Sequence, residues 1–163
     1  MRHAESWEMA RCHIHHFNHS SQALERLKQK QKDLGFERVV GIVDEVVTRW
    51  WVSFDATDCI LFLKPAIDMM HFGGDMSKVP MLENSDWKRV KEIKDCLKPF
   101  RDAQLELEGE KHVTSSTISA AIFIIRSRLK NIAEAGQNGA GARELAQSLL
   151  ADFDGCKINL FLR

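Results

Sequence analysis

Residues 84–100 read Asn-Ser-Asp-Trp-Lys-Arg-Val-Lys-Glu-Ile-Lys-Asp-Cys-Leu-Lys-Pro-Phe, and this stretch decides the fold class. Its apolar residues recur at steps of three and four, which is the spacing of one face of an α-helix. They are Trp87, Val90, Ile93, Leu97 and Phe100. Asn84 or Ser85 suits the N-cap, because short polar side chains accept hydrogen bonds from the first helical amides. Pro99 predicts a kink near Lys98.

Helical spacing continues on both sides of this stretch. We predict further helices over residues 17–32, 39–65, 66–72, 118–132 and 142–153, with Pro65 kinking or dividing the second of them. Gly35, the loop 73–83 and the glycine-rich segment 135–141 separate these helices. Phe123 and Ile124 widen the apolar stripe of helix 118–132, so we expect this helix to be buried on several sides. The fold class is mainly α, a helical bundle.

Two short segments also fit strands. Between Trp7 and Cys12 the apolar residues are few, and a strand near 8–12 is as good an interpretation as a helical turn. Near the end of the sequence, Ile158, Leu160 and Leu162 alternate with other residues, which predicts a strand over 157–162.

Composition limits the classes of function. The chain has 163 residues, 44% of them hydrophobic, which suits a globular domain with a real core. Its 23 basic and 23 acidic side chains cancel, so any contact with nucleic acid must be local. The most apolar stretch, residues 118–125, is much shorter than the roughly 20 residues that cross a bilayer, and we expect no membrane span. Four dispersed cysteines are expected to be free thiols in a reducing compartment.

Histidine is concentrated at the start of the sequence. Residues 11–18 read Arg-Cys-His-Ile-His-His-Phe-Asn, and five of the seven histidines fall within the first nineteen residues. Cys12 and His15 have the two-residue gap of half a zinc site. The second half is missing, because Cys59, Cys96, Cys156 and His112 each stand alone. We therefore expect no structural zinc, and we expect His13, His16 and His19 to be exposed.

Three stretches together resemble the transposases of the hAT superfamily. Residues 11–18 are similar to that family's Arg-Cys-x-x-His-x-Leu-Asn segment, with Phe17 where leucine is usual. Residues 48–54 are similar to its Thr-Arg-Trp-x-Ser segment. Residues 87–111 are similar to a helix that ends Leu-x-Pro-Phe and is followed by Ser-Gly-Glu-Lys. Order and spacing also fit, and the resemblance covers residues 8–153.

The resemblance implies a ribonuclease-H-like core interrupted by an all-helical insertion. Residues 1–35 would be a remnant of that core, 36–155 the helical insertion-like domain, and 156–163 a C-terminal tail. Catalysis in such enzymes needs three carboxylates that bind two divalent metal ions. Only Glu5 and Glu8 are acidic before Cys12, and neither resembles an aspartate motif. We therefore expect a truncated or domesticated transposase fragment without catalytic residues, metal or cofactor.

Four residues are candidates for residual DNA binding by this resemblance. Trp50 would stack on a base flipped out of the duplex, and Arg49 would hold a phosphate. Cys12 and His15 would shape the DNA-binding side of the site. Each has a simpler interpretation: Trp50 as part of the apolar core, Arg49 as an exposed arginine bonded to water or a carboxylate, and the other two as a partly buried, hydrogen-bonded turn.

Other interpretations concern partners and charged faces. The apolar last helix and tail also fit a helical protein-interaction module without nucleic-acid binding, through a protein partner or self-association. The basic run on helix 17–32 and the alternating charges on helix 84–100 are interpreted as solvated faces. The resemblance implies a nuclear location.

Overall fold

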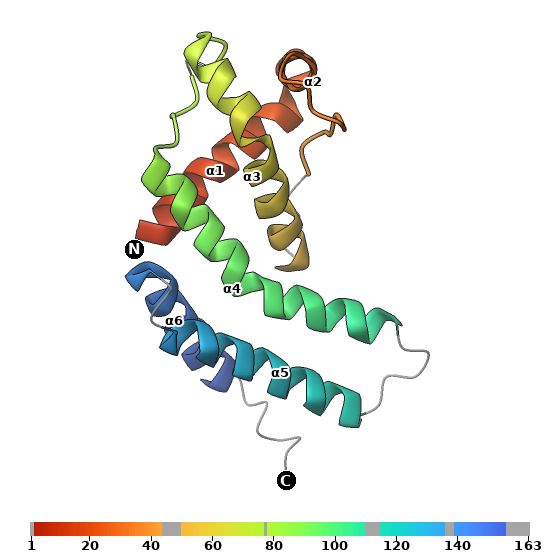
Figure 1. Cartoon of the computed structure of the whole chain (residues 1–163), viewed down its shortest axis with the longest axis vertical. Coiled ribbons are helices and arrows are strands. Elements are labelled where there is room, and N and C mark those ends of the chain that lie inside the picture. Colours follow the sequence, from red (N-terminus) through yellow and green to blue (C-terminus); the bar gives the residue numbers. More distant parts are fainter. Residues whose placement is uncertain (1, 44–49, 77, 110–114, 136–138, 156–163) are drawn as a thin grey trace. The chain divides into compact units, whose positions relative to one another are not determined.

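The computed structural model describes residues 2–43, 50–76, 78–109, 115–135 and 139–155. These residues form six helices and no β-strand (Figure 1). The helices are α1 (Arg2–His19), α2 (Ser21–Asp33), α3 (Trp50–Phe72), α4 (Asn84–Gly109), α5 (Ser115–Glu134) and α6 (Ala140–Gly155). The prediction of a mainly α fold is confirmed. The strand considered for 8–12 is wrong, because this stretch lies inside α1, and the one considered for 157–162 lies outside the described residues.

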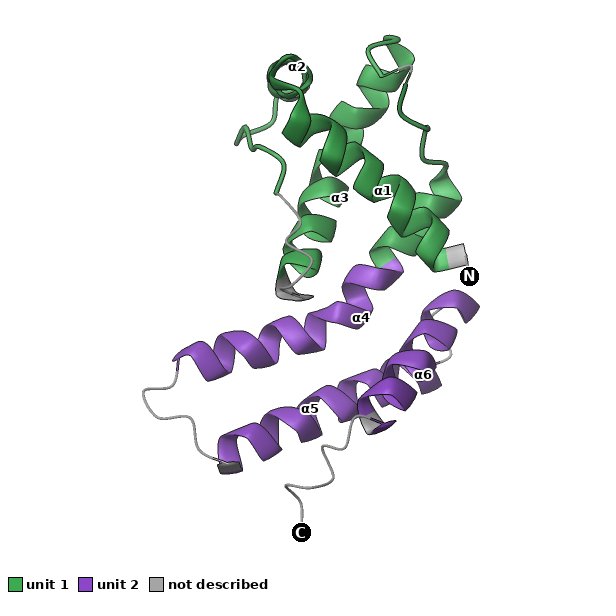
Figure 2. Ribbon diagram, turned by 180° about the vertical axis from the view of Figure 1, so that it is seen from behind, with its two compact units in different colours: residues 1–91 green, residues 92–163 purple. Residues whose placement is uncertain are grey.

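The chain divides into two compact units, coloured separately in Figure 2. Unit 1 is Met1–Lys91 and holds α1, α2, α3 and the first residues of α4. Unit 2 is Glu92–Arg163 and holds the rest of α4 with α5 and α6. The resemblance placed a boundary between residues 35 and 36, dividing a remnant of a ribonuclease-H-like core from a helical insertion. That division stays a prediction.

Unit 1 has its core where α1, α2 and α3 meet. Helix α3 contributes six of the fifteen buried side chains, more than any other helix, at the three- and four-residue spacing of one helical face. The core residues are Ala10, Ile14, Phe17, Ala23, Leu27, Ala56, Ile60, Leu63, Ala66, Ile67, Met70, Met76, Leu82, Trp87 and Val90. The last four show that the segment after α3 and the start of α4 complete the same core.

Helix α1 forms although few of its residues are strongly apolar. Its buried stripe is Ala10, Ile14 and Phe17, spaced by four and three residues, so packing on α3 favours a helix over a strand. The single helix predicted over 17–32 is in fact two. Ser20 has an extended backbone, and its side chain accepts a hydrogen bond from the Ala23 amide, so it ends α1 and caps α2.

The helix predicted to begin at Val39 is absent over residues 36–43, which have no regular secondary structure; residues 44–49 lie outside the described part. Gly35 ends α2 with a φ of +72°, a conformation that glycine adopts without steric cost. Buried Gln31 then holds the segment from the side. Its amide donates to the Val40 carbonyl and accepts from the Val40 N–H, both at 2.9 Å. This amide replaces the backbone partners that a helix would supply.

Two prolines lie inside helices. Helix α3 continues through Pro65, so of the two alternatives predicted for this residue, division of the helix is wrong and a kink stays a prediction. Helix α4 likewise continues through Pro99. The N-cap of α4 is Glu83 rather than Asn84 or Ser85, because the Glu83 carbonyl accepts from the Asp86 and Trp87 amides. Asp86 in turn accepts from the Glu83 N–H at 3.1 Å.

Unit 2 is a smaller helical assembly in which α5 packs along α6. Ala103, Ala121, Ile125 and Leu129 form a buried cluster in it. Phe100, Leu107, Leu149, Leu150 and Phe153 pack against them. The expectation that helix 118–132 is buried on several sides is wrong: Ile118 is 42% exposed and Phe123 70% exposed, so α5 buries one stripe only.

Candidate functional site

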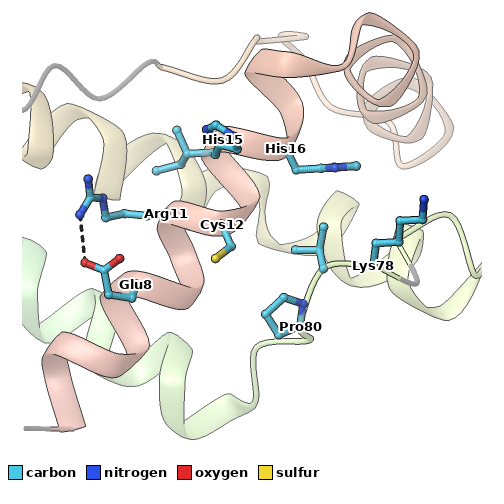
Figure 3. Close-up of a pocket in the computed structure, with 9 residues that line it drawn as sticks. Glu8, Arg11, Cys12, His15, His16, Lys78 and Pro80 are labelled. Atoms are coloured by element: carbon cyan, nitrogen blue, oxygen red, sulfur yellow. Dashed lines mark hydrogen bonds and ion pairs between the residues drawn. The ribbon is translucent and has the colours of Figure 1, made fainter.

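A hollow of about 510 Å³ lies beside α1 in unit 1 (Figure 3). We call it the α1 hollow. Its lining is Glu8, Arg11, Cys12, Ile14, His15, His16, Lys78, Val79 and Pro80. Residues three and four apart on α1 lie on one side of the helix, and they supply one wall. The other wall is the segment 78–80, which a hydrogen bond from the Val79 N–H to the Met76 carbonyl at 3.0 Å connects to the buried Met76.

Charge in the α1 hollow is mostly positive. Arg11 and Lys78 contribute two permanent cations, and Glu8 is the acid of the lining. Arg11 donates to Glu8 at 2.9 Å, in a pair whose carboxylate is largely exposed. Such surface pairs are weak, about 0–1 kcal/mol, so the guanidinium can exchange this carboxylate for another anion at little cost. Figure 3 places Cys12 between this pair and the segment that carries Pro80.

His16 adds a polar atom with no partner to the α1 hollow. Its Nε2 is buried and has no hydrogen-bond partner in the described part of the chain. Partial burial lowers the pKa of His16, so its imidazole is neutral at pH 7. A neutral imidazole can donate or accept, depending on the tautomer. The lining therefore includes two cations and a neutral imidazole whose Nε2 is itself shielded from solvent.

The structure places two of the four predicted DNA-binding residues. Cys12 and His15 are both exposed on α1, three residues apart, and both line the α1 hollow. Their alternative, a partly buried turn, is wrong because they lie on the open face of a helix. Trp50 begins α3, but its side chain is outside the described part, as is all of Arg49. Sequence reasoning quoted Arg11 and His16 beside Cys12 but missed Lys78, which is 66 residues further along the chain.

His13 corrects another expectation, because it is completely buried rather than exposed. Its Nδ1 bonds with the Met9 carbonyl at 2.9 Å, and its Nε2 lies 2.9 Å from Nε2 of His71 on α3. The pKa of His13 is lowered to about 4, chiefly by burial; the Met9 carbonyl and Asp68 raise it, and the neighbouring His71 and His16 add to the lowering. The signal was available in the sequence, since position 13 lies between Ala10 and Phe17 on the buried stripe of α1.

A second hollow, of about 890 Å³, lies between the irregular segment 36–43 and α3. We call it the α3 groove. Its apolar lining includes Val39 and Phe62, and acids stand beside it at Asp55 and Asp58. Cys59 donates to the Gly41 carbonyl at 3.3 Å, and burial raises the pKa of its thiol. This thiol is therefore a packed, protonated group rather than a nucleophile.

In the described ranges, no group of three or more His, Cys, Asp or Glu side chains is placed to hold a metal ion. Among the same residues, no helix has the length and apolar character needed to span a bilayer. Comparison of the chain with known protein families, with curated proteins and with solved structures finds no match in any of the three.

Proposed function

We propose that the chain is a catalytically inactive, transposase-derived protein of the hAT type that retains DNA binding through the α1 hollow. One observation carries the proposal. Cys12 and His15, the defining pair of the Arg-Cys-x-x-His stretch, line the same hollow as two cations, Arg11 and Lys78. The residues that suggest the family and the residues suited to a phosphate therefore lie together.

The chemistry of the α1 hollow suits one or two phosphates of a DNA backbone. Arginine and lysine bind phosphate oxygens through charge-assisted hydrogen bonds. The net charge of the whole chain is zero, so attraction to DNA must come from such a local site. Glu8 competes with phosphate for Arg11 only through an exposed and therefore weak pair.

By the same proposal, Arg49 and Trp50 also contact the DNA, as the resemblance implies. The indole of Trp50 offers a flat face for an unstacked base, and this face suits a hairpin or a frayed end better than a continuous duplex. Trp50 begins the helix α3, whose Ile60 and Leu63 belong to the same core as Ile14 of α1. One folded unit thus carries both motifs.

We propose the absence of catalysis from the position of the acidic residues near the Arg-Cys-x-x-His stretch. Glu5 and Glu8 precede Cys12, and both lie on helix α1, whereas the resembling enzymes carry their first two aspartates on strands. Two-metal phosphoryl transfer requires several carboxylates converging on one site. Incubation of supercoiled DNA with Mn²⁺ and the protein tests this. Nicking that survives repurification and disappears in a Glu8→Gln variant would overturn the proposed inactivity.

DNA binding is tested by fluorescence anisotropy with labelled hairpin-ended and blunt duplexes over a salt series. We expect Arg11→Ala and Lys78→Ala each to weaken binding about tenfold. Each should also reduce the slope of log K against log salt by about 1, since one phosphate contact is lost. Lys88→Ala is the matched control, because Lys88 is an exposed lysine of the same unit outside the α1 hollow. Trp50→Ala should remove the preference for hairpin ends alone.

Two results would contradict the DNA proposal. One is undetectable or salt-insensitive binding by the unmodified protein. The other is an equal loss in Lys88→Ala and Lys78→Ala, which would indicate attraction to scattered surface charge instead of a site. Nuclear location, which the resemblance implies, belongs to the same proposal and is tested by imaging a tagged full-length chain.

The alternative is a helical protein-interaction module, and exposed apolar side chains on α5 favour it. Phe123 and Ile118 are more exposed than large apolar residues usually are. The last helix is less suited to this role than the sequence suggested, since Leu149, Leu150 and Phe153 already pack within unit 2. Light scattering of the purified protein tests self-association: a dimer that Phe123→Asp converts to a monomer would support this alternative.

A further inference from the structure

Two exposed histidines stand one turn apart on α1. His15 and His19 are separated by four residues, the spacing that stacks side chains on one face of a helix. Their ring centroids are 3.9 Å apart, and the rings are tilted by 46°. Neither ring makes a hydrogen bond with the described part of the chain, so their nitrogens remain available to a ligand.

The spacing of the two rings suits one shared metal ion. With metal–nitrogen bonds of about 2.0–2.1 Å, two imidazoles bound side by side to one ion have ring centres roughly 4.5–5 Å apart. The observed 3.9 Å is within about 1 Å of that separation, which small rotations of two exposed side chains supply. Pairs of histidines four apart on a helix are a recurrent geometry for zinc ligands.

We propose that His15 and His19 form a two-imidazole chelate for a single late first-row transition metal ion, with Zn²⁺ and Cu²⁺ as the fitting ions. Neutral imidazole suits these ions, and Cu²⁺ binds more tightly than Zn²⁺ in the Irving–Williams order. The remaining coordination positions are open to water or to an external ligand, because no third donor from the described residues converges there. The site differs in this respect from a closed structural zinc site, which the sequence does not support.

The chelate also affects the helix that carries it. An ion bridging positions 15 and 19 connects two consecutive turns at the end of α1, next to the Ser20 break. Binding to the folded form alone stabilises that form in proportion to the logarithm of the free metal concentration. His15 also lines the α1 hollow, so the metal test contains no DNA, and its failure is distinguishable from failure of the DNA proposal.

The experiment is isothermal titration of the tag-free, full-length protein with Zn²⁺ at pH 7.5. We expect one ion per chain, with affinity falling at least tenfold in His15→Ala and in His19→Ala. Each single variant keeps one monodentate imidazole, and the double variant should show no measurable binding at this site. His3→Ala is the matched control, since it removes an imidazole of α1 that has no second histidine four residues on.

Two further results decide the assignment. Affinities within twofold of the unmodified protein in both single variants would overturn the proposal, as would a double variant that still binds one ion with the affinity of the unmodified protein. Cys12→Ser should retain the affinity, and its loss would show a thiolate site in place of a two-imidazole one. All three residues are exposed, so circular dichroism should show unchanged helix content, and a variant that unfolds would be replaced by its glutamine equivalent.

Discussion

The Nε2 atoms of His13 and His71 lie 2.9 Å apart, a distance that accommodates one proton between them. Nδ1 of His13 must carry a proton, because its partner, the Met9 carbonyl, can only accept. In neutral His13 the Nε2 atom is therefore the acceptor, and His71 donates to it. Two protonated rings would place two N–H groups and two positive charges against each other at the junction of α1 and α3.

This pair makes the stability of unit 1 dependent on pH. The pKa of His13 is lowered from 6.5 to about 4 in the folded protein, which corresponds to about 3 kcal/mol. Because the folded pKa is the lower one, the stabilisation is complete above pH 6.5. It decreases as the pH falls from 6.5 to about 4, since the unfolded chain then binds a proton that the folded chain excludes. His71 shifts in the same direction because of burial.

Urea unfolding measured at pH 7.5 and pH 5 checks this prediction. The unmodified protein should lose about 2 kcal/mol of unfolding free energy between the two conditions. His13→Gln is less stable at pH 7.5 but should lose much less on acidification, because its amide does not titrate. His19→Gln, at an exposed position of the same helix, should behave like the unmodified protein. An equal acid loss in His13→Gln and the unmodified protein would contradict this account.

Gln31 is predicted to be the most sensitive glutamine of α2. Replacing it by alanine leaves the Val40 N–H and carbonyl without their partners, at a cost of about 2 kcal/mol. Gln31→Glu should cost more, since a carboxylate cannot donate to the Val40 carbonyl. Gln29→Ala is the control, because Gln29 is exposed and bonds with Asp33 on the surface, and it should change stability by less than about 0.5 kcal/mol. Denaturant midpoints measure all three.

The described cysteines should differ strongly in reactivity. Burial raises the pKa of Cys96 to about 12, with Asp95 and Glu92 contributing, so little thiolate exists at pH 8. Cys12 is exposed and should be alkylated by iodoacetamide at least about 100-fold faster than Cys96. Cys59, partly buried and bonded to Gly41, should react at an intermediate rate. Peptide mass spectrometry gives each rate, and labelling of Cys96 as fast as that of Cys12 would refute the assigned burial.

Gly35 and Gly41 allow the cost of a strained backbone conformation to be measured apart from any steric clash. A methyl group added at Gly35 or at Gly41 would meet no other atom within 4 Å, but only Gly35 of the two has a positive φ. Gly35→Ala should therefore destabilise the protein by about 1–2 kcal/mol, from the left-handed conformation alone. Gly41→Ala should be neutral or slightly stabilising, because it restricts the unfolded chain. Thermal melting compares the two variants, and equal effects would show that the conformation at Gly35 is not the cause.

The helices that could be predicted are those whose stripe is made of large apolar residues. In α4, Trp87 and Val90 are buried where the spacing indicated, and α6 ends at Gly155 as expected. Helix α1 was missed because Ala10 and His13 carry part of its buried face, and neither marks a stripe by hydrophobicity. The spacing of apolar residues along the sequence predicts a helix only when the side chains that the helix buries are themselves strongly apolar.

The segment 36–43 and the α1 hollow depend on tertiary contacts, which the spacing of residues in the sequence does not predict. The three- and four-residue steps among Val39, Val43 and their neighbours fit a helix, but a tertiary contact with Gln31 selects an irregular segment. In the α1 hollow, the wall formed by Cys12 and His15 could be found from the motif. Lys78 comes from a distant loop, and only the packing of Met76 in the core brings it there.

The double hydrogen bond between Gln31 and Val40 has a consequence for local unfolding. The Val40 amide is protected from exchange with solvent by a side chain of α2, not by a neighbouring backbone. It can exchange only when that side chain withdraws, so its exchange rate reports the separation of the segment 36–43 from α2. A single amide in a segment without regular structure thus serves as a probe of how that segment docks on a helix.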